Sequence, residues 1–144
     1  MKRSVALLEL SREHHEALVL ARRASGADPG SEAAREQRTH LLTRWAAQIG
    51  PHFALEEEVL LPALVAAGQA GPAAKALAQH TGLRRLLERL RNGDLRALPA
   101  WGDAMQAHVH FEERALFPLA ERTLDLNALA GSLDRTASTA HSSP

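Results

Sequence analysis

The stretch HFALEEEVLLP (His52–Pro62) places a histidine and a glutamate four residues apart among apolar residues. The stretch HVHFEERALFP (His108–Pro118) repeats this skeleton 56 residues later. Trp45 and Trp101, the only two tryptophans of the chain, are separated by the same 56 residues. The chain therefore contains two copies of one sequence element, and the residues of that element decide what kind of fold can hold it.

In both copies, large apolar residues flank the histidine and the glutamate at steps of three and four, which places them on one face of an α-helix. The first face is Trp45, Ile49, His52, Glu56 and Leu60, and the second is Trp101, Met105, His108, Glu112 and Leu116. Such a face packs into a core, where an ionised carboxylate is costly unless it is paired or bound to a metal. The histidines and glutamates should therefore have partners inside the protein.

Two further histidines lie on apolar stripes of helical period. His14 lies between Leu10 and Ala17, and His80 lies between Leu77 and Leu83. With His52 and His108 they give four helices, each of which directs an imidazole inward, and two of these helices add a carboxylate.

The rest of the sequence predicts an all-α protein. Ala, Leu, Arg, Glu and Gln dominate, and β-branched residues are scarce. Gly- and Pro-containing breaks divide the chain into helical segments of about 4–24, 32–66, 72–91 and 96–121. Four amphipathic helices joined by short connections predict an antiparallel, up-down-up-down four-helix bundle.

Local signals refine this prediction. Ser31 is suited to cap the second segment and Pro72 to lie in the first turn of the third, while Pro51 should kink the second segment without ending it. A short fifth helix, capped by Asp125, is expected at about 126–133. We therefore predict one domain over residues 1–133 and a small, polar, disordered tail over 134–144.

Composition narrows the possible functions. The chain has 144 residues, 45% hydrophobic and 24% charged, with 17 basic and 17 acidic side chains. This balance gives no reason to expect nucleic acid or an anionic membrane as a partner. The absence of cysteine excludes disulfides, thiolate metal sites and cysteine nucleophiles. No apolar stretch is long enough for a signal peptide or a membrane span, so we expect a cytoplasmic, soluble protein.

The six inward residues predict a metal site. They are His14, His52, Glu56, His80, His108 and Glu112. Imidazole and carboxylate without thiolate favour iron, manganese or zinc. The alternative is a metal-free core in which buried histidines and glutamates bond to one another.

Several neighbouring residues receive other interpretations. His15, adjacent to His14, is expected to be exposed but is the alternative ligand of the first helix. We expect His40, His110 and His141 on the surface. Glu57 and Glu113 should lie at the surface too, or else hydrogen-bond a ligand imidazole from outside the ligand set.

The order of these residues distinguishes between metal-site families. The Glu-x-x-His pairs of ferritin-like bundles and the His-Glu-x-x-His of zinc proteases are absent. The order His, His-x-x-x-Glu, His, His-x-x-x-Glu resembles that of the hemerythrin-like proteins, the His-His-Glu cation-binding domain family. The motifs LSREHH, PHFALEEEVLLP, QHTGLRRLL and HVHFEERALFP carry this resemblance, which covers about residues 4–122.

The resemblance implies a four-helix bundle around a non-haem di-iron centre, in which Glu56 and Glu112 bridge two irons and the four histidines are terminal ligands. Zinc or manganese are possible substitutes. The chain departs from the oxygen carriers of the family: Arg84 stands where they have a second histidine on the third helix. The family's helix-four aspartate is matched by a glutamate, at a spacing one residue shorter.

These departures shift the expectation away from oxygen carriage. The resemblance implies sensing of oxygen, nitric oxide or iron, or iron handling and oxidative-stress defence, with a small diatomic ligand or anion at the metal. A di-iron oxidase or peroxidase is the alternative, and a metal-free structural bundle is a further one. The sequence names no protein partner.

Overall fold

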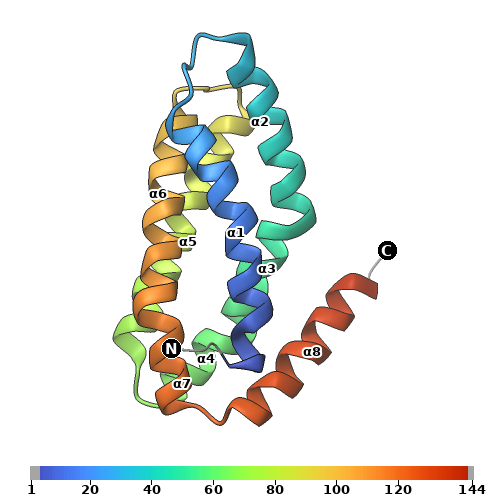
Figure 1. Cartoon of the computed structure of the whole chain (residues 1–144), viewed down its shortest axis with the longest axis vertical. Helices are drawn as coiled ribbons and strands as arrows, with labels where there is room; N and C mark the ends of the chain where they lie inside the picture. The colour runs from blue at the N-terminus through green and yellow to red at the C-terminus, as the bar shows by residue number, and fades with distance from the viewer. Residues whose placement is uncertain (1–3, 143–144) are drawn as a thin grey trace.

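A computed structural model gives the structure of the chain, and it describes the backbone of residues 4–142 and the side chains of residues 4–136. Figure 1 shows the long helical segments side by side and a further helix at the C-terminal end. In chain order the elements are α1 (Val5–Ser25), α2 (Glu32–Arg44), η1 (Trp45–Ile49), α3 (Gly50–Leu55), η2 (Glu56–Leu60), α4 (Leu61–Ala66), α5 (Ala70–Arg91), α6 (Ala97–Phe111), η3 (Glu112–Leu116), α7 (Phe117–Thr123) and α8 (Leu126–Ser142). Within the described backbone there is no strand, so the predicted all-α class is confirmed.

The long segments agree with the predicted ones. α1, the continuous run from α2 to α4, α5, and the run from α6 to α7 begin and end within two residues of the predicted bounds. α6 packs along both α1 and α5, and α4 packs against α5. Of the described helices, none has an apolar stretch that is long enough to cross a membrane.

Three π-helical turns, η1, η2 and η3, interrupt the second and fourth segments, and each is followed by one residue and then a proline. In each turn a backbone N–H reaches back five residues: Gly50 to Trp45, Leu61 to Glu56, and Phe117 to Glu112. A proline has no N–H and its ring collides with the carbonyl four residues earlier, and a wider turn relieves both problems.

The internal repeat supports this explanation. The position that matches Pro51 in the fourth segment is Ala107, and there the helix stays regular from Ala97 to Phe111. The irregularity expected at Pro51 is therefore a π turn, and the helix continues through it as predicted.

The helix ends follow their local sequence signals. The Ser31 side chain accepts a hydrogen bond from the Ala34 N–H, as predicted for an N-cap. The α4 and α5 ends are followed by Gly68 (φ +84°) and Gly93 (φ +90°), which adopt the left-handed conformation that favours glycine at helix ends.

The C-terminal helix differs from the predicted one. Asp125 caps it, since its carboxylate accepts from the N–H groups of Asn127 and Ala128. However, α8 continues to Ser142, so residues 134–142 are helical where we expected a disordered tail. Residues 143 and 144 lie outside the described part of the chain, and the division into a domain and a tail stays a prediction.

The apolar core consists of two clusters, one toward each end of the long segments. One cluster contains Leu20, Trp45, Phe53, Leu87 and Trp101, and the other contains Leu7, Leu10, Leu60, Leu64 and Phe117. Buried histidines and glutamates lie between them. One detail differs from the sequence analysis: Leu77 is 47% exposed, and Ala76 is the buried neighbour of His80 on that side.

α1 and α6 approach each other closely at Gly102. A Cβ atom at Gly102 would lie 2.4 Å from the Ala21 carbonyl oxygen and 2.4 Å from the Ser25 backbone nitrogen. Real Cβ atoms do not come this close to backbone, so the contact requires glycine. The close approach holds α6, and with it His108, against the helix that carries His14.

Candidate metal centre

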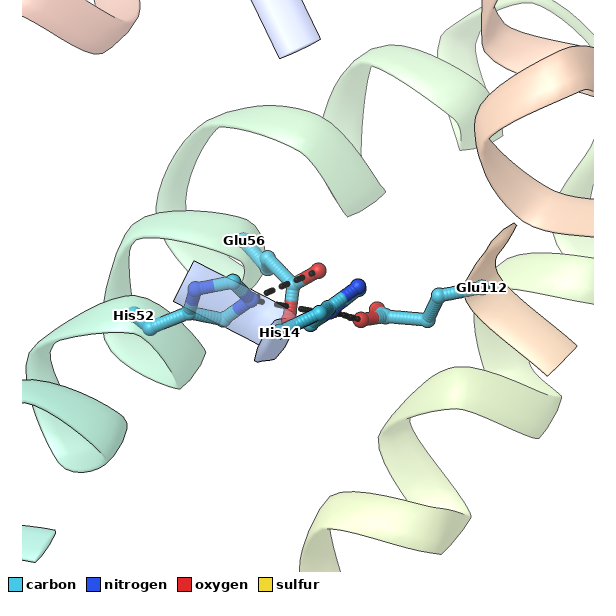
Figure 2. Close-up of side chains that lie close together, drawn as sticks. All are labelled: His14, His52, Glu56 and Glu112. Carbon is cyan, nitrogen blue, oxygen red and sulfur yellow. Dashed lines mark hydrogen bonds and ion pairs between the residues drawn. The ribbon is translucent and has the colours of Figure 1, made fainter. Parts of the chain in front are cut away.

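The six predicted metal ligands lie together between the two apolar clusters. All are buried, and Glu56, His80, His108 and Glu112 have no exposed surface. They form two groups of four in which the ligand atoms lie within 4.8 Å of one another. One group joins His14 and His52 with Glu56 and Glu112 (Figure 2), and the other joins His80 and His108 with the same two glutamates.

The sharing of both carboxylates makes this a two-centre arrangement. We call the two groups the His14–His52 half and the His80–His108 half. In each half the imidazoles are neighbours, with ring centroids 5.1 Å apart for His14 and His52, and 4.8 Å apart for His80 and His108. The sequence could not assign the histidines to these pairs.

Each imidazole turns its Nε2 atom toward the glutamates. The distances to a carboxylate oxygen are 2.9 Å from His14 to Glu112, 3.5 Å from His52 to Glu56, 3.2 Å from His80 to Glu56, and 3.3 Å from His108 to Glu112. Only the contact from His14 is aligned as a hydrogen bond in this set. Four imidazole nitrogens and two carboxylates therefore converge, but most of them do not form hydrogen bonds with one another.

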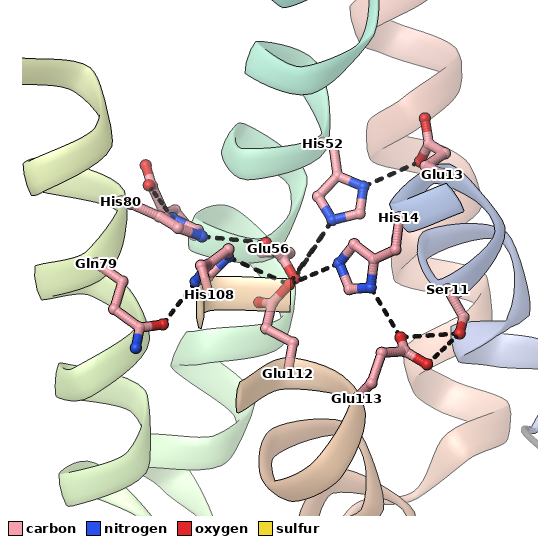
Figure 3. A network of polar contacts seen from close by, with 11 residues as sticks. Ser11, Glu13, His14, His52, Glu56, Gln79, His80, His108, Glu112 and Glu113 are labelled. Carbon is pink, nitrogen blue, oxygen red and sulfur yellow. Dashed lines mark hydrogen bonds and ion pairs between the residues drawn. The ribbon is translucent and has the colours of Figure 1, made fainter. Parts of the chain in front are cut away.

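On the side away from the shared glutamates, the Nδ1 atom of each imidazole contacts a side-chain oxygen (Figure 3). The partners are Glu113 for His14 at 2.8 Å, Glu13 for His52 at 3.2 Å, Glu57 for His80 at 2.6 Å, and the Gln79 side-chain carbonyl for His108 at 2.6 Å. An acceptor at Nδ1 keeps the proton there and leaves the Nε2 lone pair free to face inward, which is how metal-binding histidines are oriented.

Two of these outer partners follow from the sequence and two were missed. Glu57 and Glu113, each the residue after a shared glutamate, take the hydrogen-bonding role that the sequence analysis gave as one alternative. Glu13 and Gln79 were not singled out. Each directly precedes the inward histidine of its helix, which is the signal that could have found it.

The atoms that face the middle of the cluster lack hydrogen-bond partners in the described part of the chain. They are Nε2 of His52, His80 and His108, both carboxylate oxygens of Glu56, and Oε2 of Glu112. Buried polar atoms are almost always paired, and leaving several unpaired in one place is costly. A cation between them would satisfy all of them, so the donor set fits a metal centre.

The pKa values of the shared carboxylates point the same way. Burial, and next the adjacent Glu112 carboxylate, raise the pKa of Glu56 well above its usual value. Burial also acts to raise the pKa of Glu112, but its close polar contacts with Glu56, His108 and His14 outweigh burial and hold that pKa well below its usual value. Both carboxylates can be ionised together only where a cation lies between them, and a metal ion is such a cation.

The remaining histidines and Arg84 lie outside the cluster. His15, His40 and His110 are exposed, as expected, and the side chain of His141 lies outside the described residues. Arg84 donates to Glu57 Oε2 at 2.6 Å, the same oxygen that holds His80. Arg84 therefore acts on the centre through Glu57 and does not take the place of a ligand.

A small cavity of about 10 Å³ adjoins the His14–His52 half. His14, His52, Glu13, Gln48 and Met105 line it, together with Ala17 and Ile49. Its volume is roughly the room that one water molecule needs.

Comparison with known proteins agrees with this geometry. The sequence model of the hemerythrin HHE cation binding domain matches residues 6–120 of the chain. This range contains all six residues of the cluster and ends before α8. Neither a curated protein nor a solved structure matches the chain.

Proposed function

The chain belongs to the hemerythrin HHE cation-binding family, and on this premise we propose that it binds two iron ions, one in each half of the cluster. In this proposal His14 and His52 would hold one iron, His80 and His108 would hold the other, and Glu56 and Glu112 would serve both. We also propose that the four long segments form the antiparallel up-down-up-down bundle that the resemblance implies.

One observation carries the proposal. Two groups of buried donors share both of their carboxylates, and six of the inward atoms have no hydrogen-bond partner in the described chain. The alternative is a metal-free core in which these histidines and glutamates hydrogen-bond to one another, and such a core would leave these atoms paired. Bound irons would supply redox chemistry and open coordination positions for a small molecule.

The chain's own residues set what such a centre can do. The outer partners fix the four imidazoles, so the ligand geometry is held before a metal binds. The apolar clusters on both sides limit access of water. The cavity beside His14 and His52 has room for about one water molecule and is far too small for an organic substrate.

These features support a sensor or iron-handling role over the oxidase or peroxidase alternative. We propose that the protein binds a diatomic ligand such as oxygen or nitric oxide in the cytoplasm, in signalling, iron handling or oxidative-stress defence. Zinc or manganese could occupy the same donors in the absence of iron.

Metal analysis of freshly prepared, iron-supplemented protein tests the proposal. We expect two irons per chain and a thermal transition that falls after chelation, because the emptied site leaves two carboxylates on apolar faces. A content of no more than trace metal would overturn it. Stopped-flow mixing of the reduced protein with oxygen should then give the ferric form, whereas oxygen uptake that reverses fully at low oxygen pressure would indicate a carrier.

A further inference from the structure

A second and larger cavity lies against the same half of the cluster. It has a volume of about 280 Å³ and is bounded by α1, by the run from η1 to η2, and by α8. α8 packs on α1, α3 and η2 and closes one side of it, with Leu129 and Leu133 buried beneath. Figure 1 shows α8 beside the lower part of α1 and diverging toward its C-terminal end.

This groove meets the small cavity at the metal centre. Glu13, Gln48 and His52 line both spaces. The three side chains therefore form the partition between the groove and the cavity that adjoins His14 and His52. The groove therefore leads along α8 to a wall that it shares with the cavity beside one half of the cluster.

We propose that the groove under α8 is the route by which a small uncharged ligand of the size of dioxygen or nitric oxide reaches the His14–His52 half, with Gln48 as the gate. The inference rests on the proposed function, since it concerns access to the iron of that half.

The lining of the groove favours an uncharged ligand. Most of its residues are apolar, among them Leu10, Ala47, Leu55 and Leu133, and its charged residues are all acidic. These are Glu9, Glu13, Glu58 and Asp134; Glu9 has Arg12 at 3.7 Å, but Arg12 does not line the groove. An acidic mouth repels anions and leaves neutral molecules unaffected.

The partition has one residue that can move without disturbing the centre. Glu13 orients His52 through the 3.2 Å contact at Nδ1, so its displacement would release a ligand. Gln48 has no contact of this kind with a histidine; its side-chain oxygen accepts from Arg44 at 2.9 Å. Exchange of that hydrogen bond with water would open the partition and leave the imidazoles in place.

The wall formed by α8 is a property of this chain beyond its family domain. The family match ends at residue 120, and α8 begins at Leu126. Ala130, Leu133, Asp134 and Thr136 of α8 all line the groove. Access to the centre is therefore set partly by a helix outside the matched region.

The test measures ligand association with the full-length, iron-loaded protein. Iron content is determined first, and nitric oxide association with the reduced protein is then followed by stopped-flow absorption. Ala47→Trp and Ala130→Trp fill the groove from opposite walls, and each should slow association by about tenfold or more, as gating of access does. Gln48→Ala should accelerate it several-fold.

Ala115→Trp is the matched control. Ala115 is exposed and lines a different surface groove with Gly71 and Lys75, so a tryptophan there should leave the rate unchanged. Two variants that fill the groove are used in case one of them does not fold. Either Ala47→Trp or Ala130→Trp is sufficient for the comparison if it binds the full content of iron.

The effect of the acidic residues that line the groove is tested by measuring azide association with the oxidised protein. Glu58→Lys and Asp134→Lys should accelerate azide association at low salt, lose that effect at high salt, and leave nitric oxide association unchanged. Wild-type rates in iron-replete Ala47→Trp, Ala130→Trp and Gln48→Ala would overturn the route while leaving the proposed function intact. Absence of iron from the wild-type protein would overturn the proposed function and the route with it.

Discussion

The His14–His52 half and the His80–His108 half have the same skeleton but different surroundings. In the first half both outer partners are carboxylates, Glu113 and Glu13, and Glu113 also accepts hydrogen bonds from the Ser11 hydroxyl. In the second half the carboxylate of Glu57 is paired with Arg84, and the other partner, Gln79, is an uncharged amide. The first half therefore has two outer carboxylates, and the second half has one carboxylate and one amide.

The histidine pKa values also differ between the two halves. Burial lowers the pKa of both His14 and His52, but hydrogen bonds and charge from the nearby glutamates outweigh it and raise both values. Burial, followed by the charge of His108, lowers the pKa of His80 to about 4. An outer carboxylate makes an imidazole a stronger donor. The His14–His52 half should therefore bind its metal more tightly and favour the higher charge state.

The largest effect is expected when one of the two carboxylates that both halves share is removed. Glu56→Ala or Glu112→Ala should lose both metals, because each carboxylate belongs to both groups. Metal content per chain after iron loading is the measurement. Glu58→Ala, an exposed neighbour, is the control and should keep the wild-type content. Retention of one full equivalent in Glu56→Ala would show that this carboxylate does not bridge.

The next effect separates the halves. His14→Ala should lose the metal of its own half and keep about one equivalent at the other, and His80→Ala should do the reverse. Mössbauer spectra of the two variants should show one iron environment each, and the two environments should differ. His15→Ala, next to His14 but exposed, is the matched control and should keep both metals. Identical spectra from both variants would mean that the halves are equivalent.

A smaller effect comes from exchanging the outer partners. Glu13→Gln should weaken metal binding in its half by about 10–100-fold, the usual cost of changing a residue that orients a ligand. Gln79→Glu should strengthen the other half and bring the two binding steps together. Competition with a chelator of known affinity measures both steps. The charge comparison is wrong if Gln79→Glu instead spreads the two steps further apart.

The smallest effect concerns Arg84, a partly exposed residue. Arg84→Gln should lower the free energy of unfolding of the chelated protein by about 0.5–1 kcal/mol, as expected for a surface ion pair. Burial raises the pKa of Glu57, but hydrogen bonds from Arg84 and His80 outweigh it and leave the value lowered.

A carboxyl whose pKa is lowered by folding stabilises the protein above its unfolded pKa, and this contribution is lost as pH falls through the folded value. The difference between wild type and Arg84→Gln should therefore be full at neutral pH and shrink below about 4.5. Urea unfolding at several pH values measures it. A difference that grows in acid would contradict the assigned direction.

The sequence by itself determined the elements and the inward residues. A period of three and four places His14, His52, His80 and His108 on apolar faces, and this periodicity is local, so it can be read without knowing what the face meets. The same local chemistry predicted the caps at Ser31 and Asp125. The repeated His-x-x-x-Glu spacing then indicated a shared chemistry, and the family match agrees with it.

Tertiary structure alone decided how these faces combine. Periodicity fixes the side of a helix on which a residue lies, but not which helix lies opposite or at what height. The pairing of His14 with His52 and of His80 with His108 depends on contacts between segments far apart in the chain. So does the role of Glu13, which looks like any partly exposed glutamate until α1 is placed beside His52. The length of α8 was hidden for the same reason: its polar composition resembles a tail, and its packing against α1 and α3 is a property of the assembled bundle.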